Sequence, residues 1–352
     1  MKTLVMLCHM SNCTGYGQLG IHLARGFIKA GWQVKIRPAA VWEPEGWGNT
    51  KIPDDIRALF VTGPQPEPDE LLLHPPNFLP TPGKRTTYFT MHETNRITPL
   101  AVSVLNRAHQ VVVPCKMNAE SFADSGVRRP IHTVPLGIDP KVFHYHPMPY
   151  EYPTIIRFGC AGRMAHGGVR KGINEVVDAF LKAFPTEKDV RLEVKGFPDC
   201  GIKPVCDPRV IIHQACWTDQ QIAFWYSTLS CFVSAAKGEG FGLMQLQSLA
   251  TGRPLISIYW GGVAEFFEPP EMGYELCSKL EPAKFAYEGQ GMWSVPDEHD
   301  LIESMKAFRL SWVTQPFDFE QISRDASQFT WENTCERLSE VIGNEKADLP
   351  PQ

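Results

Sequence analysis

Short apolar segments rich in β-branched residues alternate with amphipathic segments along most of the chain. Residues 17–32 place Leu19, Leu23 and Phe27 on one helical face, and Gly31 ends that helix. Strands are expected at 3–8, 32–40, 56–63, 85–91, 110–115 and 131–136, and again at 156–163, 190–196, 210–215, 229–236 and 254–259. Further helices are expected at 172–185, 218–229, 242–252 and 331–343. Strands that alternate with helices predict parallel sheets covered by helices on both faces.

The length of 352 residues suits two domains, each able to bury its own core. A Tyr- and Pro-rich stretch at 144–154 has no periodicity and indicates the boundary between them. The fold class is therefore α/β, with two doubly wound, Rossmann-like domains. A ligand cleft is expected where the carboxyl ends of the two sheets face each other.

The composition is that of a soluble protein, with 43% hydrophobic and 21% charged residues. No apolar run reaches the roughly 18 residues that span a membrane. The apolar start at residues 1–12 is interrupted by His9 and polar residues, so we interpret it as a first strand and not as a signal peptide. The ten cysteines form no Cys-x-x-Cys pair, which predicts buried thiols in a reducing cytoplasm.

The net charge of −5 conceals a difference between the two halves. Residues 1–150 hold 15 Lys and Arg against 11 Asp and Glu, giving +4, and the remainder holds 34 − 15 = 19 against 39 − 11 = 28, giving −9. Random surface variation explains such a difference as well as a partner does, because charge balance concerns partners and not the fold.

The stretch KGEGFGLMQLQSLATGRP, residues 237–254, follows an apolar strand. Its glycines predict a tight turn, and a helix begins near Gly242, so the free N–H groups of residues 241–244 form an anion site suited to a diphosphate. The alternative is an ordinary glycine-rich turn with Glu239 as a solvated charge.

This stretch resembles the donor-binding motif of the retaining glycosyltransferases of family 4, which have the GT-B fold. That motif has a Glu in an E-G-F-G-L run, here Glu239, and a second Glu eight residues later, here replaced by Gln247. The segments TGYGQLGIHLARGF, VPLGIDPKVF, GCAGRMAHGGVRKGINEVVDAF and FTWENTCERL also resemble family segments, so the likeness covers nearly the whole chain. It implies an acceptor-side domain at 1–147, a nucleotide-sugar domain at 148–328 and a last helix within 329–352 that crosses back.

The resemblance implies the following site residues. Donor-binding residues would be Gly15, Gly17, Arg163, Lys171, Glu239, Gly240, Phe241, Gly242, Leu243 and Gln247. Catalytic residues would be His92, Glu239, Arg163 and Lys171, with Glu93 in reserve for acceptor activation, Trp217 near the nucleotide base and Glu265 orienting the donor loop. For His92 a packed loop histidine is the competing interpretation, and for Trp217 a core residue.

Gln247 is the one departure from the motif. Gln keeps the length and hydrogen-bonding capacity of Glu but loses the charge, so contact with the nucleotide ribose can survive. The competing interpretation is a decayed site that only binds sugar nucleotides.

No cofactor or metal is expected, because the chain has no Asp-x-Asp and the predicted cations and helix end can balance the diphosphate. The resemblance implies transfer with retention, by attack on the same face from which the diphosphate leaves, from a UDP- or GDP-sugar. Alternatives are an epimerase or phosphorylase of the same fold, or a binding protein without activity. The acceptor would be a saccharide or small molecule, or else a phosphate-bearing acceptor such as a lipid phosphate or a hydroxymethylated DNA base, nucleic acid entering only in that last form.

Overall fold

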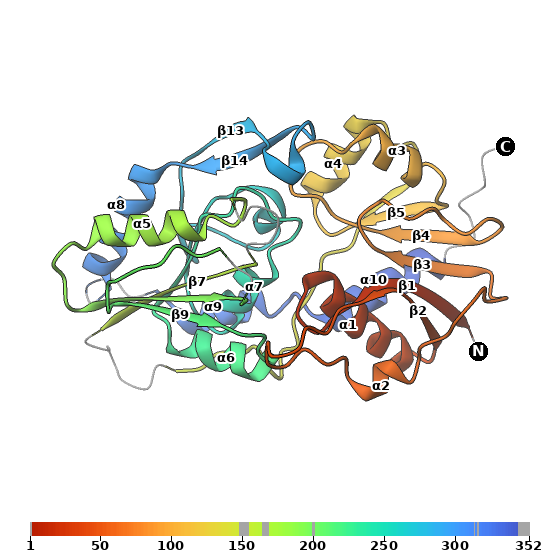
Figure 1. Cartoon of the computed structure of the whole chain (residues 1–352), viewed down its shortest axis with the longest axis horizontal. Helices are drawn as coiled ribbons and strands as arrows, with labels where there is room; N and C mark the ends of the chain where they lie inside the picture. The colour runs from red at the N-terminus through yellow and green to blue at the C-terminus, as the bar shows by residue number, and fades with distance from the viewer. Residues whose placement is uncertain are drawn as a thin grey trace. The chain divides into compact units, whose positions relative to one another are not determined.

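The computed structural model describes residues 2–147, 155–163, 169–198, 201–312, 314 and 317–343. The chain forms two compact units, each with its own six-stranded sheet (Figure 1). Unit 1 comprises residues 1–137 and 329–352, and unit 2 comprises residues 138–328. The stretch expected to be the domain boundary, 144–154, is described only as far as Pro147.

Unit 1 is built on a parallel sheet in the order β2-β1-β3-β4-β5-β6. Its strands are β1 (Thr3–Met10), β2 (Gln33–Val41), β3 (Asp69–Leu73), β4 (Arg85–Phe89), β5 (Gln110–Val113) and β6 (Ile131–Thr133). The central strand β1 is buried at most positions, as a parallel strand covered on both faces should be. The apolar start of the chain is thus a strand, as predicted.

The strand predicted at residues 56–63 is wrong. Asp54–Arg57 form the short helix α2, whose acidic first turn favours a helix N-terminus, and only Phe60 forms a bridge to β2. The third strand is instead β3, Asp69–Leu73, which the sequence pattern did not reveal. Its Glu70 is buried in the strand, and this charge interrupts the apolar run that would have indicated a buried strand.

Helices in two groups cover the sheet of unit 1. They are α1 (Gly15–Lys29), α2, α3 (Pro99–Leu105), α4 (Lys116–Ser125) and α10 (Trp331–Gly343). Helix α1 contacts α2 and α10, whereas α3 contacts α4, and Figure 1 shows α3 and α4 above the strands and α1 and α2 below them. The C-terminal helix packs closely on α1, since a Cβ at Gly26 would lie 2.1 Å from the Cys335 Sγ and the rings of His22 and Trp331 stack at 4.7 Å.

Unit 2 is built on a second parallel sheet in the order β12-β11-β10-β7-β8-β9. Its strands are β7 (Ile156–Ala161), β8 (Val190–Gly196), β9 (Val210–Gln214), β10 (Cys231–Ser234), β11 (Leu255–Ser257) and β12 (Gly273–Glu275). An antiparallel hairpin of β13 (Ser278–Pro282) and β14 (Met292–Pro296) follows. The sequence pattern predicted β7 to β11 but neither β12 nor the hairpin.

The helices of unit 2 also form two groups. They are α5 (Ile173–Ala183), α6 (Asp219–Thr228), α7 (Leu243–Ala250), α8 (Glu298–Ser311) and α9 (Phe319–Ala326), with 3₁₀ turns η1 (Gly261–Glu265) and η2 (Phe285–Tyr287). Helix α5 contacts α8, and α7 contacts α6 and α9. Aromatic side chains fill the core beneath α5 and α8, where the ring of Phe158 lies 5.7 Å from those of Phe184 and Phe308.

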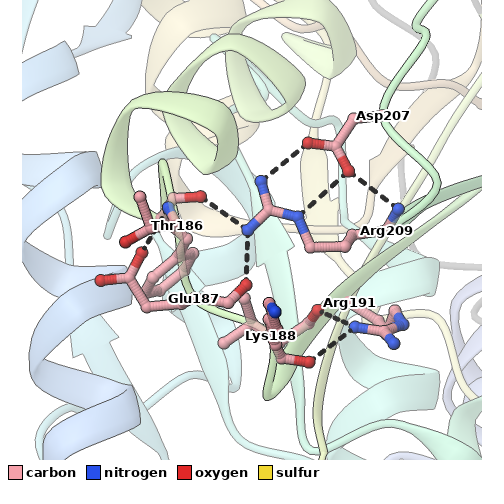
Figure 2. A network of polar contacts seen from close by, with 8 residues as sticks. Thr186, Glu187, Lys188, Arg191, Asp207 and Arg209 are labelled. Carbon is pink, nitrogen blue, oxygen red and sulfur yellow. Dashed lines mark hydrogen bonds and ion pairs between the residues drawn. The ribbon is translucent and has the colours of Figure 1, made fainter.

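Arg209 fastens the start of β9 to the loop between α5 and β8 (Figure 2). Its guanidinium donates to both carboxylate oxygens of Asp207, at 3.0 and 2.7 Å, and to the carbonyl oxygens of Phe184 and Glu187, at 2.7 and 2.6 Å. The fork of donors on one planar group explains why a single Arg can hold two segments. This network lies at the amino ends of β8 and β9 and so fixes the scaffold, not the site.

Arg253 is fully buried and holds the carboxyl end of α6. Its guanidinium donates to the carbonyl oxygens of Tyr226 and Ser227, where the helix C-terminus attracts a positive charge, and to that of His146. Burial lowers the pKa of Arg253 to about 10. Within the stretch 237–254, Arg253 therefore has a structural role.

The cysteines depart in part from the prediction of buried thiols. Free and buried are Cys8, Cys115, Cys160, Cys231 and Cys335, and burial raises the pKa of Cys8 to about 12. Cys206 and Cys277 are free but exposed. The spacing of cysteines along the chain does not fix whether a thiol is buried or exposed.

Candidate functional site

Two glycine turns of unit 2 bring their charged residues together. The first turn, Arg170–Gly172, precedes α5 and lies against the end of β10, because the Lys237 backbone N–H donates to the Arg170 carbonyl at 2.8 Å. Gly172 has a φ of 63°, and a Cβ there would lie 2.2 Å from the Ala235 carbonyl oxygen. Only glycine fits this approach, which places Lys171 beside the second turn.

Glu239, in the second turn, lies between two cations. Its Oε1 is 2.5 Å from the Lys171 Nζ, and its Oε2 is 3.2 Å from the Arg170 guanidinium. The residue is only 8% exposed. Burial raises the pKa of the Glu239 carboxyl, but the positive charges of Lys171 and Arg170 outweigh burial and hold this pKa below its ordinary value. Glu239 is therefore a buried carboxylate and not the solvated charge that was the competing interpretation.

A third glycine segment, at the start of η1, supports the turn that carries Glu239. The Gly262 backbone N–H donates to the Glu239 carbonyl at 2.9 Å, and a Cβ at Gly262 would lie 2.1 Å from the Phe241 Cα. Gly242 has a φ of 100° and precedes the first residue of α7. The start of η1 thus packs against the turn at residues 237–242, which we call the site turn. This contact fixes the backbone of the site turn.

The amino end of α7 is the predicted anion site. Gly240 and Phe241 are buried, the ring of Phe241 lies 5.3 Å from that of Phe266, and Leu243 begins the helix. The N–H groups of a first helical turn have no acceptor within their own helix. The start of α7 therefore has the backbone geometry that a phosphate-binding turn requires, and phosphate binding there stays a prediction.

Two glutamines of α7 have different surroundings. Gln245, which the sequence reasoning did not select, is buried and donates from its Nε2 to the Ser234 Oγ at 3.0 Å, so it ties α7 to the end of β10. Gln247 lies in the second turn of the helix and is half-buried. The sequence could not show which of the two glutamines is buried, because both positions carry the same residue type.

Lys171 packs against Gly162, the residue before Arg163. A Cβ at Gly162 would lie 3.1 Å from the Lys171 Cγ, so the Lys171 stem runs along the residue that precedes Arg163. Arg163 is half-buried. The intervening residues 164–168 lie outside the described part of the chain. Glu265, predicted to orient the donor loop, is the half-buried last residue of η1.

Trp217 belongs to a cluster of rings and charges after β9. Its ring lies 5.2 Å from that of His213 and 6.0 Å from that of Trp225, and the Lys195 Nζ lies 5.8 Å from its centre. The cluster surrounds Glu193, which accepts hydrogen bonds from Arg157, His213 and Trp225 at 2.9, 3.3 and 3.0 Å. Trp217 itself is half-buried, so it packs on this cluster while keeping part of its ring exposed.

In unit 1, His92 and Glu93 follow β4 in a loop that is held by buried side chains. Asn118 of α4 accepts from the His92 backbone N–H at 3.0 Å and donates to the His92 carbonyl at 2.8 Å. The Tyr16 hydroxyl accepts from the Met91 backbone N–H at 3.1 Å. Neither Asn118 nor Tyr16 was predicted. Asn118 is buried within a helix, and no sequence pattern distinguishes it from an exposed helical Asn.

The two glycines predicted in unit 1 differ in kind. A Cβ at Gly17 would lie 1.9 Å from the Ser11 carbonyl oxygen, so the turn between β1 and α1 requires glycine there. A Cβ at Gly15 would meet no atom within 4 Å. Thr14 caps α1 by accepting from the Gly17 N–H at 3.2 Å. Gly17 is thus explained by packing within unit 1, whereas Gly15 leaves open space at the helix start.

Neither a cluster of metal ligands nor a membrane-spanning helix occurs in the described part of the chain. Among residues 2–147, 155–163, 169–198 and the described remainder, no group of three or more His, Cys, Asp or Glu side chains is arranged to hold a metal ion. In that same part of the chain, every helix is too short or too polar to cross a membrane.

Comparison with known proteins adds sequence relatives. Residues 156–291 match the model of the family described as Glycosyl transferases group 1. Over 177 residues, the chain is 30% identical to the lipopolysaccharide core biosynthesis mannosyltransferase LpsB of Rhizobium meliloti (strain 1021). That match spans 47% of this chain and 48% of the relative, about half the length of each.

Solved structures extend the likeness to the whole chain. Sucrose-phosphate synthase from Thermosynechococcus elongatus matches with a TM-score of 0.67 and 16% identity, over 97% of this chain and 98% of that one. The lipopolysaccharide outer core galactosyltransferase WaaB matches with a TM-score of 0.66 and 13% identity, over 97% and 99%. WaaG, a glycosyltransferase involved in lipopolysaccharide biosynthesis, matches with 0.65 and 13%, over 97% and 100%.

At these identities the structural likeness establishes the fold, and the predicted pair of Rossmann-like domains is confirmed. Function has to be argued from the site and from the matched segment. That segment, residues 156–291, holds Arg170, Lys171 and Glu239 together with the start of α7. The chain has the GT-B fold, and its residues 156–291 match the group 1 glycosyl transferases.

Proposed function

We propose that the protein is a glycosyltransferase that moves a sugar from a nucleotide-sugar donor to an acceptor hydroxyl. The observation that carries this proposal is the buried Glu239 carboxylate, held between Lys171 and Arg170 at the amino end of α7. Cations and a helix N-terminus suit a diphosphate, and a fixed carboxylate suits sugar hydroxyls. A nucleotide sugar contains both groups in one molecule.

Lys171, Arg163 and the first turn of α7 would hold the donor diphosphate. Lys171 and Arg170 bring two positive charges to the single carboxylate of Glu239, so their immediate group carries a net charge of +1. Negative charge develops on the diphosphate as it leaves, and fixed donors that strengthen their contacts in that state accelerate the reaction. These cations support transfer without a metal ion.

Glu239 would accept hydrogen bonds from hydroxyls of the transferred sugar, and Gln247 would bind the ribose of the nucleotide. The glycine turns fix the Glu239 backbone, so its carboxylate needs little reordering when the sugar binds. A carboxamide at Gln247 offers both a donor and an acceptor to ribose hydroxyls. Glu239 and Gln247 would thus bind the sugar and the ribose of the same donor molecule.

In the proposed reaction the acceptor oxygen attacks the anomeric carbon from the face on which the diphosphate leaves. The bond between the anomeric carbon and the diphosphate oxygen breaks, and its electron pair stays with the diphosphate. The acceptor proton passes to that same oxygen, and the new carbon–oxygen bond retains the configuration. Glu239 positions the sugar in this scheme and is not a nucleophile.

Unit 1 would supply the acceptor side. His92 would contact the transferred sugar, and Glu93 would assist the acceptor hydroxyl. The Asn118 clamp on the His92 backbone supports this role, because a residue that positions a substrate is held by its surroundings. Gly15 and Gly17 lie in the turn that begins α1 and would admit the donor.

The names of similar proteins suggest the substrate classes. LpsB, WaaB and WaaG are named as enzymes of lipopolysaccharide synthesis, and a structure of the O-GlcNAc transferase GtfA, 14% identical, contains UDP and GlcNAc. A UDP- or GDP-hexose donor and a saccharide acceptor follow as the first expectation. The positive first half of the sequence makes a phosphate-bearing acceptor the second.

The test is a radiolabelled transfer assay. Purified protein is incubated with UDP- and GDP-hexoses and a panel of glycans, lipid phosphates and hydroxymethylated DNA, with a Glu239→Ala variant as control. The proposal is supported if the wild-type protein transfers sugar to an acceptor and the Glu239→Ala variant does not. Epimerised donor, release of a sugar 1-phosphate, or donor binding without any turnover would each assign the site to a different function.

A further inference from the structure

Arg170 was not predicted, yet it makes three contacts in the site. Its guanidinium donates to the Gly238 carbonyl oxygen at 2.5 Å and to the Glu239 Oε2 at 3.2 Å. The same group lies over the ring of Tyr287, with 5.9 Å between the guanidinium carbon and the ring centre. One planar cation thus holds both the backbone before Glu239 and its carboxylate, while an aromatic ring covers one of its faces.

Tyr287 comes from η2, in the segment that joins β13 to β14, and this hairpin is fastened to the same site turn. The Ser294 backbone N–H donates to the Lys237 carbonyl at 2.8 Å, and the Lys237 Nζ lies 5.7 Å from the centre of the Trp293 ring. Trp293 and Ser294 are buried. The hairpin therefore reaches the site turn through β14 and reaches Arg170 through Tyr287.

We propose that Arg170, braced by Tyr287, is a positioning residue that sets the Glu239 carboxylate for the donor sugar, so that the β13–β14 hairpin takes part in sugar selection. This inference rests on the proposed function. The contacts support it because Lys171 holds Oε1 and Arg170 holds Oε2, which together fix the plane of the carboxylate. A carboxylate fixed in one plane favours sugars whose hydroxyls match that plane.

A lysine could not replace Arg170 in this role. Lysine supplies one point charge, whereas the Arg170 fork reaches the Gly238 carbonyl and the Glu239 carboxylate together, with its guanidinium carbon 5.9 Å from the centre of the Tyr287 ring. Because Arg170 contacts the Glu239 Oε2 and Lys171 contacts the Oε1, loss of Arg170 would free one carboxylate oxygen while leaving the Lys171 contact in place. The expected defect is therefore in sugar recognition and not in diphosphate binding.

The test measures steady-state kinetics and binding for four variants. Arg170→Lys keeps the charge, Tyr287→Ala removes the ring, Tyr287→Phe keeps it, and Lys279→Ala changes an exposed residue of the same hairpin as a control. Each is assayed with nucleotide hexoses that differ in configuration at one hydroxyl, and each is titrated with the nucleoside diphosphate by calorimetry. Circular dichroism confirms that the variants fold.

For Arg170→Lys and Tyr287→Ala we expect kcat/KM with the preferred donor to fall about tenfold, and selectivity between the epimeric donors to narrow, with diphosphate affinity within about twofold of wild type. Tyr287→Phe should retain more activity than Tyr287→Ala because it keeps the ring, and Lys279→Ala should behave as wild type. An equal loss of diphosphate affinity would show that Arg170 binds phosphate, and unchanged selectivity would show a purely structural contact. Either result overturns the inference but leaves the proposed function intact, whereas a wild type that binds no nucleotide sugar overturns both.

Discussion

Lys171 and Glu239 come from turns 68 residues apart and meet at 2.5 Å in the interior of unit 2. Each turn contains a glycine with positive φ, Gly172 and Gly242, and a Cβ at Gly172 would lie 2.2 Å from the Ala235 carbonyl oxygen. The two backbone turns therefore fix the positions of Lys171 and Glu239, in contrast to a surface ion pair between two mobile side chains. A buried carboxylate fixed in this way keeps its charge and its orientation for a ligand.

Removing a cation from the proposed diphosphate site should weaken donor binding. Lys171→Ala or Arg163→Ala deletes one charge-assisted contact, worth about 1.5–3 kcal/mol, and should lower affinity for the nucleoside diphosphate by roughly tenfold to over a hundredfold. Calorimetry measures the affinity. Lys182→Ala, which breaks an exposed ion pair on α5, is the matched control and should bind normally. Unchanged affinity in a folded Lys171→Ala protein would show that the phosphates bind elsewhere.

Glu239 and Gln247 should have separable effects. Glu239→Ala should reduce transfer far more than it reduces binding of the nucleoside diphosphate, because that ligand lacks the sugar. Gln247→Ala should weaken both, and Gln247→Glu should be tolerated because the side chain keeps its shape. Transfer rates and calorimetry on the same preparations check all three. Near-normal transfer by Glu239→Ala, or none by Gln247→Glu, would contradict the division of the donor between these residues.

Transfer should survive chelation. Lys171, Arg163 and the amino end of α7 are proposed to stabilise the leaving diphosphate, so EDTA should leave most of the rate. The assay compares initial rates with EDTA, with Mg²⁺ and with Mn²⁺. An absolute requirement for either ion would refute the electrostatic argument.

Asn118 should matter for both stability and turnover. Asn118→Ala leaves the His92 backbone N–H and carbonyl without their buried partner, which should lower the free energy of unfolding by about 1–3 kcal/mol and reduce kcat if His92 contacts the sugar. Urea denaturation measures the first effect and the transfer assay the second. Glu120→Ala, on the exposed face of the same helix, serves as control. A stable Asn118→Ala protein would mean that the loop does not depend on this clamp.

Glu193 should make stability depend on pH. Burial raises the pKa of Glu193, but hydrogen bonds from His213 and Arg157 outweigh burial and hold the folded-state pKa below its ordinary value. A carboxyl whose pKa is lower when folded stabilises the protein above its unfolded pKa of about 4.3, and this contribution is lost as the pH falls through the lowered value. The difference in unfolding free energy between wild type and Glu193→Gln should therefore be large at pH 7 and shrink at acid pH. A difference that stays constant with pH would assign the effect to packing. As a control, Glu303→Gln removes an exposed ion pair with Lys306 and should change the free energy of unfolding little at any pH.

The sequence by itself determined the fold class and the main site turn. Thr3–Met10 is a nearly continuous apolar run, Val190–Gly196 alternates apolar and charged residues, and α1 carries its buried residues at helical spacing. Each of these patterns is local in the sequence and predicts its element. The glycine turn before α7 was also predictable, since φ > 0 at Gly242 restricts the residue type locally. Lys171 and Glu239 were selected through the resemblance of their motifs to a known family.

Tertiary structure alone decided which residues complete the site. Asp69–Leu73 is a strand only because its neighbours pair with it and its Glu70 finds partners in the interior, whereas the stretch 56–63 is not a strand, because its first two residues belong to α2. Arg170, Asn118 and Gly262 act across 69, 26 and 23 residues of chain, respectively. Contacts of such separation leave no period in the sequence, because they depend on where parallel strands end and on which loops meet there.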